Sequence, residues 1–213
     1  MTRILSKNGY DMTGIDNSIE MLEEAMEKEM DDESDRQILY LNRSMTDFEM
    51  YGTQRAFISC CDSVNYLTET ADMEQMFRLV NNYLDPNGIF IFDFNTEYYY
   101  KCVLGKKTIA ETRDDVAFIW ENTYHEKEHI NELNLTLFTR LEDEEDIFER
   151  TEECHLQRGY SLEEVKALLE KAGMTFVYAL DGYGNEPANS NSTRVLVVAR
   201  ENGESQPDKV RSL

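Results

Sequence analysis

The chain has 213 residues, with 43 acidic against 21 basic side chains and a formal net charge of −22. Such a surface repels phosphate backbones and anionic lipids, so we expect neither nucleic acid nor membrane as a partner. A hydrophobic content of 41% is too high for a disordered chain, and the length fits one domain. No apolar run reaches the roughly 20 residues of a membrane-spanning helix, and no signal segment opens the chain.

The four cysteines show neither CxxC nor Cys/His metal spacing. Cys60 and Cys61 are adjacent within an apolar run, as is typical of reduced core residues. We therefore expect a cytoplasmic, single-domain protein without a bound metal.

Short apolar runs alternate with helical patterns in the first half of the chain. The apolar runs lie at residues 10–15, 38–41, 57–60 and 89–92. One helix follows Asn17 or Ser18, either of which can cap it, and another begins near Thr70 and stops at the turn 85–88. Short apolar strands separated by helices predict a parallel α/β sheet covered on both faces.

The hydrophobic period changes to two after residue 107, which predicts an antiparallel meander of three or four strands up to residue 156. A capping box at 161–164 then starts a helix that ends at Gly173. Two last strands are expected at 174–180 and 194–199, followed by a disordered tail over 201–213.

Polar residues directly follow four apolar runs of the predicted sheet, where ligands of α/β proteins bind. These polar segments are 16–18, 44–47, 60–66 and 93–96. In a doubly wound sheet, a carboxylate at the end of the sheet's second strand suits a ribose diol, because it accepts two hydrogen bonds from adjacent hydroxyls. The run 10–15 is interpreted as that second strand. Asp16 has this position, although a helix-capping or turn role is the plainer alternative.

A series of segments, in order and at sensible spacing, resembles class I S-adenosylmethionine-dependent methyltransferases of a bacterial small-molecule type. They are GYDMTGIDNSIEMLEEA, SMTDFE, CDSVNYL, LDPNGIFIFDFNT, WENTYHEKEHINELNLTLFTRL, ERTEECHLQRGYSLEEVKALLEKAGM and RVLVVARE. The resemblance runs from about Ile4 to Arg200, which is nearly the whole chain.

The resemblance implies S-adenosylmethionine as cofactor and a small molecule as methyl acceptor. Asp16 would hold the cofactor's ribose, while the uncharged Ser44 stands where the family commonly has an adenine-binding Asp. The residues implied for the cofactor are Asp16, Asn17, Ser18, Met21, Ser44, Met45, Cys61 and Asp62. Those implied for the acceptor are Asn65, Tyr66, Asp93 and Asn95.

The family's glycine-rich loop, DxGxGxG, does not occur in this chain. Residues 1–8 resemble the tail of the helix that follows this loop, so we expect a Rossmann-like methyltransferase sheet that lacks its first strand and carries an antiparallel meander after strand five. The expected parts are an incomplete cofactor-binding core over 1–104, a lid insertion over 105–158, a completing segment over 159–200 and the tail over 201–213.

Three accounts of the absent strand are open. We favour a fragment produced by a misplaced start codon. Alternatively, a second polypeptide or a homodimer supplies the absent piece, or the chain is a decayed paralogue that no longer binds cofactor. A non-catalytic module that pairs through an exposed sheet edge is the alternative function, and a nicotinamide-dependent oxidoreductase ranks below it.

The implied chemistry is in-line methyl transfer, which needs alignment, desolvation and at most one base. Asp62 and His155 are the catalytic candidates. The plainer alternatives are a turn-capping Asp62 and a solvated or strand-surface role for all three histidines. Trp120, Tyr124 and Phe138 could form an aromatic lid over the acceptor, or they could be core residues. The tyrosines at 98–100 could gate the pocket, or they could belong to a loop packed on the sheet. The acidic run 142–146 is interpreted as a solvated turn.

Overall fold

The computed structural model describes residues 1–30, 37–141 and 147–203. It divides the chain into two compact units, residues 1–51 and 52–213, and each is described by itself. The acidic turn at 142–146 and most of the expected tail lie outside the described residues. Among the described residues, no helix has the length and apolar character needed to cross a bilayer.

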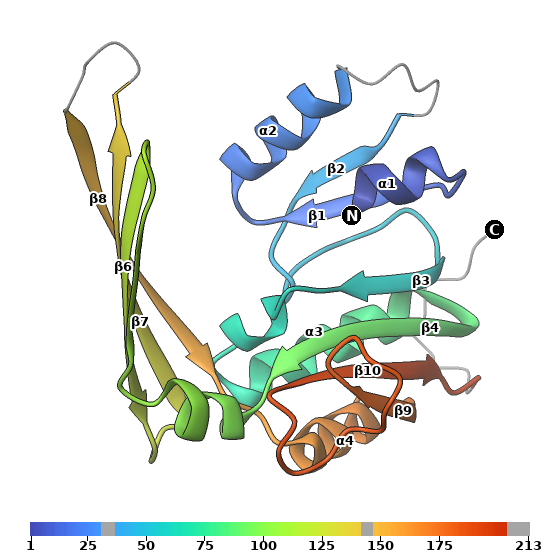
Figure 1. The fold of residues 1–213 in the computed structure, drawn as a ribbon. Helices are drawn as coiled ribbons and strands as arrows, with labels where there is room; N and C mark the ends of the chain where they lie inside the picture. The colour runs from blue at the N-terminus through green and yellow to red at the C-terminus, as the bar shows by residue number, and fades with distance from the viewer. Residues whose placement is uncertain (31–36, 142–146, 204–213) are drawn as a thin grey trace. The chain divides into compact units, whose positions relative to one another are not determined.

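In its described residues, the first unit contains two helices and a two-stranded parallel sheet (Figure 1). Its elements are α1 (Thr2–Lys7), β1 (Thr13–Asp16), α2 (Ile19–Met30) and β2 (Leu39–Asn42). Ser18 caps α2, because its Oγ accepts the Met21 N–H at 3.2 Å. Gly14 lets the two strands pack closely, since a Cβ there would lie 2.8 Å from the Tyr40 ring. The sequence prediction of strand, capped helix and strand is confirmed here.

The second unit contains a four-stranded sheet in the order β3-β4-β10-β9. The strands are β3 (Gln54–Ser59), β4 (Leu84–Asn95), β9 (Met174–Asp181) and β10 (Arg194–Glu201). β3 and β4 are parallel, whereas β10 is antiparallel to both β4 and β9. The sheet is therefore mixed rather than parallel, because the loop 182–193 returns the chain directly beside β9 without a crossover helix.

Helices α3 (Thr70–Tyr83) and α4 (Leu162–Lys171) contact each other and cover one face of this sheet (Figure 1). Phe77 of α3 packs against Phe90 and Phe92 of β4, with ring centroids 6.0 and 5.3 Å apart, and all three rings are buried. Ser161 caps α4 by accepting the Glu164 N–H at 3.1 Å, and Gly173 follows the helix with φ of +76°. The predicted cap at Ser161 and the helix end at Gly173 are confirmed, whereas the Glu164 carboxylate accepts from Arg158 at 3.1 Å instead of completing a capping box.

A second four-stranded sheet, entirely antiparallel, has the order β5-β6-β7-β8. Its strands are β5 (Thr108–Thr112), β6 (Val116–His125), β7 (Ile130–Arg140) and β8 (Phe148–Arg158). The chain enters it from β4 through the helical turn η2 (Tyr99–Leu104) and leaves it toward α4. Tyr100 is buried in η2 and stacks on Tyr124 of β6 at 6.4 Å, so both tyrosines belong to a small core rather than to a mobile gate or lid.

Candidate functional site

The polar strand ends of the first unit lie side by side because β1 and β2 are parallel. Asp16 pairs with Asn42 at the carboxyl end of the sheet, and the Arg43 N–H donates to the Asp16 carbonyl at 2.9 Å. The Asp16 carboxylate accepts the Ser18 N–H at 2.9 Å, as in the plainer helix-start alternative. Ser44 begins the turn just beyond and accepts the Thr46 N–H at 3.2 Å. These contacts leave the proposed ribose role of Asp16 as a prediction.

A sharp turn follows β3 in the second unit. Cys61 and Asp62 both adopt the left-handed conformation, with φ of 63° and 52°, and the short helix η1 (Ser63–Tyr66) follows at once. This turn brings the Asp62 N–H within 3.2 Å of Asp93 Oδ2, at the end of β4. The Asp62 side chain does not cap η1, so the plainer turn-capping alternative for this carboxylate is wrong.

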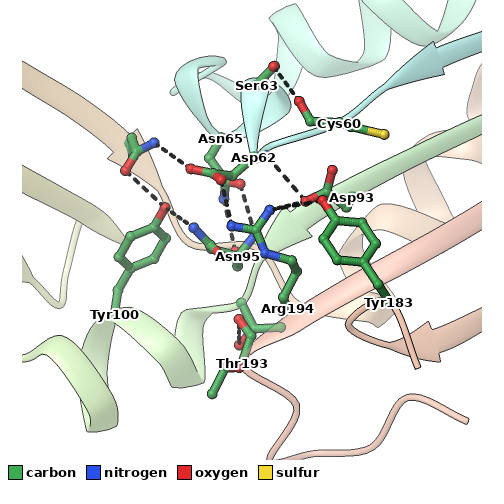
Figure 2. A network of polar contacts seen from close by, with 12 residues as sticks. Cys60, Asp62, Ser63, Asn65, Asp93, Asn95, Tyr100, Tyr183, Thr193 and Arg194 are labelled. Carbon is green, nitrogen blue, oxygen red and sulfur yellow. Dashed lines mark hydrogen bonds and ion pairs between the residues drawn. The ribbon is translucent and has the colours of Figure 1, made fainter. Parts of the chain in front are cut away.

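Arg194 joins the two carboxylates at the ends of β3 and β4 (Figure 2). Its Nη2 lies 2.6 Å from Asp62 Oδ1, and its Nη1 pairs with Asp93 Oδ2. Asp93 is fully buried, whereas 22% of the Asp62 side chain and 26% of the Arg194 side chain are exposed. Arg194 reaches them because it begins β10, opposite Asn95 of β4.

The two carboxylates of this cluster favour the ionised form of the Arg194 guanidinium. Burial lowers the pKa of Arg194, but its hydrogen bonds to Asp62 and Asp93 and their negative charge raise that pKa further, so the net shift is upward. Arg194 also stacks on the Tyr183 ring at 5.8 Å. The second oxygen of Asp93, Oδ1, is buried and has no hydrogen-bond partner among the described residues.

The antiparallel sheet contributes one buried amide to the cluster. Gln157 of β8 donates from Nε2 to Asp62 Oδ2 at 3.2 Å, and its Oε1 accepts the Tyr100 hydroxyl at 3.2 Å. Burial raises the pKa of Tyr100, so this hydroxyl stays protonated and continues to donate. Gln157 therefore links the antiparallel sheet to Asp62, the carboxylate that follows β3 of the mixed sheet.

Asn65 of η1 fixes the backbone around the cluster. Its Oδ1 accepts the Asn95 N–H at 2.9 Å, and its Nδ2 donates to the carbonyls of Asn95 and Arg158 at 2.9 and 2.7 Å. Because the Asn65 side chain is fully buried, these bonds satisfy groups that water does not reach. This arrangement makes Asn65 a scaffold for the site rather than a free ligand contact.

Four of the predicted residues, Asp62, Asn65, Asp93 and Asn95, thus come together in one polar cluster. Tyr66 and His155 also meet, with the Tyr66 hydroxyl 3.3 Å from His155 Nδ1. Asp16, Asn17, Ser18, Met21, Ser44 and Met45 lie in the first unit. Cys61 is exposed in the turn before η1.

Sequence reasoning missed Arg194 and Gln157 as site residues. Arg194 directly precedes the apolar run 195–199, which is a visible signal, but nothing in the sequence pairs it with β3 and β4. Gln157 lies in a strand of alternating pattern whose polar positions look solvated. No group of three or more His, Cys, Asp or Glu suited to a metal occurs among the residues with described positions.

The chain is similar in sequence to two bacterial proteins, each named "Putative methyltransferase". One, from Geobacillus sp. (strain WCH70), is 28% identical over 196 residues, covering 92% of this chain and 78% of that protein. The other, YqeM of Bacillus subtilis (strain 168), is 28% identical over 197 residues, covering 92% and 77%. No protein-family model matches the chain.

Solved structures show the same fold at lower identity. An S-adenosylmethionine-dependent methyltransferase from Clostridium acetobutylicum ATCC 824 has a TM-score of 0.82 at 24% identity, over 90% of this chain and 75% of that one. CalS10 of Micromonospora echinaspora, an amino pentose methyltransferase with S-adenosylmethionine bound, has a TM-score of 0.69 at 15% identity, over 93% and 78%. The sugar N-methyltransferase KedS8 from Streptoalloteichus sp ATCC 53650 has a TM-score of 0.65 at 14% identity, over 87% and 70%.

The predicted resemblance is therefore confirmed. The chain resembles methyltransferases in sequence, and its α/β fold is that of S-adenosylmethionine-dependent methyltransferases.

Proposed function

We propose that this protein takes part in S-adenosylmethionine-dependent methyl transfer to a small-molecule acceptor. The observation that carries the proposal is the cluster of Asp62, Asp93 and Arg194 at the carboxyl ends of β3 and β4, where α/β enzymes bind ligands. Because the cluster occurs in a fold similar to that of a methyltransferase, we interpret it as part of a ligand site and not as a solvated surface ion pair.

The donor chemistry of the strand ends fits the cofactor. Asp16 ends β1 with a carboxylate that suits a ribose diol, and Ser44 and Met45 would border the adenine, with Asn17, Ser18 and Met21 at the start of α2. In the second unit, Cys61 and Asp62 would border the methionine part. When bound, this cofactor supplies a methyl group on a positively charged sulfur, and carboxylates nearby suit that charge.

The acceptor side is proposed for the buried carboxylate of β4. Asp93 Oδ1 has no hydrogen-bond partner among the described residues, so an N–H or O–H of an acceptor would satisfy it once the side chains that bury it move aside. The similar structures CalS10 and KedS8 are sugar methyltransferases, which supports a small polar acceptor of this kind. Asn65 and Asn95 would hold the surrounding backbone, and Tyr66 would lie at the rim.

The finer architecture is also part of the proposal. The antiparallel sheet over 105–158 would serve as a lid on a core formed by 1–104 and 159–200, and the core would lack its family's first strand and glycine-rich loop. The edge strand β3 would then be where a further strand adds, from an upstream segment, a second copy or another polypeptide. A non-catalytic scaffold is the alternative, and it retains the same edge.

Calorimetric titration with S-adenosylmethionine tests the proposal, with NAD as the comparison ligand. The 213-residue chain and a version extended upstream through any glycine-rich loop are titrated side by side. Saturable binding of S-adenosylmethionine by either version, without binding of NAD, supports the proposal. Absence of binding by both versions, with a stoichiometric protein partner recovered on the tagged chain, would favour the scaffold instead.

A site variant makes the titration specific. Asp16→Asn removes the charge that is proposed to hold the ribose, and Asp11→Asn, at an exposed position before β1 in the same unit, is the matched control. We expect Asp16→Asn to weaken binding roughly tenfold or more, because a hydrogen bond to a charged group contributes about 1.5–3 kcal/mol. Equal affinities of both variants would remove Asp16 from the site.

A further inference from the structure

Strand β8 carries three polar side chains in a row on one face. Glu153, His155 and Gln157 occupy alternate positions, and alternate side chains of a strand point to the same side. Gln157 of this row contacts Asp62 at 3.2 Å. The face that carries His155 is therefore the face turned toward the polar cluster.

His155 stands between a carboxylate and a phenol. Its Nε2 lies 2.9 Å from Glu153 Oε2, and its Nδ1 lies 3.3 Å from the Tyr66 hydroxyl. The Tyr66 and His155 rings meet edge to face, with centroids 5.8 Å apart and planes at 78°. These contacts join η1, which directly follows Asp62, to β8 of the antiparallel sheet.

The chemistry of the two partners sets the tautomer of the neutral imidazole. An ionised carboxylate only accepts hydrogen bonds, so the ring proton lies on Nε2 and is donated to Glu153. Nδ1 then keeps its lone pair and accepts the hydrogen bond that the Tyr66 hydroxyl donates. Burial, together with the negative charges of Asp62 and Glu153, raises the pKa of Tyr66, so this residue is a protonated phenol at neutral pH.

We propose that Tyr66, His155 and Glu153 form a proton relay for the methyl acceptor, with Tyr66 as the group that touches it. This inference rests on the proposed function and deepens it. The Tyr66 side is accessible to a ligand, since 47% of the residue is exposed, while 28% of the His155 side chain is exposed behind it. The relay assigns to Glu153 a role that sequence spacing does not indicate.

The relay moves one proton from the acceptor to His155. The acceptor's N–H or O–H proton passes to the Tyr66 oxygen while the Tyr66 proton passes to His155 Nδ1, so no free phenolate is formed. The electron pair of the broken bond stays on the acceptor atom and forms its bond to the methyl carbon, whose former bonding pair remains on the sulfur. Glu153 then neutralises the imidazolium that results.

The chain offers a matched control for this relay. His125 of β6 also pairs with a carboxylate, with its Nε2 3.2 Å from Glu132 Oε2, and 44% of its side chain is exposed. It lies in the same antiparallel sheet, at the end of β6. A general effect of removing a histidine–glutamate pair from this sheet should therefore appear in His125→Gln as well.

The first test is nitrogen NMR of the histidine rings in wild type, Tyr66→Phe and His125→Gln, and it needs no ligand. We expect His155 as the Nε2–H tautomer, and in Tyr66→Phe a downfield shift of its unprotonated Nδ1, as this nitrogen loses its hydrogen-bond donor, with the His125 signals unchanged. A predominant Nδ1–H tautomer in wild type, or an Nδ1 signal unmoved in Tyr66→Phe, would overturn the relay.

The second test measures kcat and KM against pH with S-adenosylmethionine and two acceptor probes, the amino sugar glucosamine and catechol. We expect His155→Gln and Tyr66→Phe to lower kcat about a hundredfold, the usual contribution of a positioned base, and Glu153→Gln to lower it about tenfold. The wild-type decline of rate toward acidic pH should disappear in His155→Gln, whereas affinity for S-adenosylmethionine and the His125→Gln profile stay at wild-type values.

The outcomes separate the two proposals. Binding and turnover at wild-type rates in Tyr66→Phe and His155→Gln would overturn the relay and leave the proposed function standing. Failure of every version of the chain to bind S-adenosylmethionine would instead overturn the proposed function, and the relay with it. Where the cofactor binds but neither probe is methylated, the NMR result decides for or against the relay.

Discussion

The two sheets of the second unit bury different kinds of side chain. In the mixed sheet, Phe90, Phe92 and Val197 are at most 1% exposed and pack under α3 and α4. In the described part of the antiparallel sheet the buried residues are few, and most of them are amides. They are Asn122, Tyr124, Asn131, Leu133 and Gln157. The comparison indicates that the mixed sheet supplies most of the stability, while the antiparallel sheet contributes polar groups at the end where it meets the site.

The largest effect is expected in the aromatic core of the mixed sheet. Phe92→Ala should lower the free energy of unfolding by about 3–5 kcal/mol, because it leaves a cavity between Phe77 and Phe90. Phe138→Ala, at a half-buried position of β7, should cost about 1–2 kcal/mol. Urea unfolding followed by circular dichroism, and by fluorescence of Trp120 in β6, measures both. Equal losses would contradict the division between the sheets.

The next effect concerns the ion pairs at the end of the mixed sheet. Arg194→Met should destabilise the protein by about 3 kcal/mol at neutral pH, because it leaves the buried Asp93 carboxylate without its partner. Arg200→Met on the same strand is the control, since Arg200 is exposed. Urea unfolding at neutral pH measures both losses. Equal losses in Arg194→Met and Arg200→Met would mean that the pairing of Arg194 with Asp62 and Asp93 adds nothing to stability.

A smaller effect is expected where the chain passes from the antiparallel sheet into α4. Ser161→Ala should cost about 1 kcal/mol, because the Glu164 N–H loses its capping acceptor. Ser190→Ala in the exposed loop before β10 should change little. Urea midpoints of the two variants are compared. Equal midpoint shifts in Ser161→Ala and Ser190→Ala would show that the Ser161 cap does not stabilise the connection from β8 to α4.

The smallest effect is on reactivity rather than stability. Burial, and then the negative charge of Asp93, raises the pKa of Cys60 at the end of β3. Cys154 of β8 is exposed. Because the thiolate is the reactive form, iodoacetamide should modify Cys154 several-fold faster than Cys60 near pH 8, with the difference narrowing as the pH rises. Peptide mass spectrometry over time measures both rates, and faster labelling of Cys60 would contradict the effect of its half-buried position.

Much of the local structure could be predicted, because it depends on neighbours in the chain. The spacing of apolar residues located β1, β3 and α3, and the serine at position 161 located the start of α4. The direction of β10 could not be read in this way, since it depends on which strand lies beside it. Of the site, the polar ends of β3 and β4 were predictable, because they follow apolar runs.

The sequence by itself determined the elements, the acidic surface and the family that the chain resembles, because these follow from composition, local periodicity and contiguous motifs. Only the tertiary structure decided that Arg194 pairs with both Asp62 and Asp93, and that Tyr66 faces His155. The physical reason is distance along the chain. Arg194 is separated from Asp62 by 132 positions and Tyr66 from His155 by 89, so only the packing of strands brings their charges and protons within reach of one another.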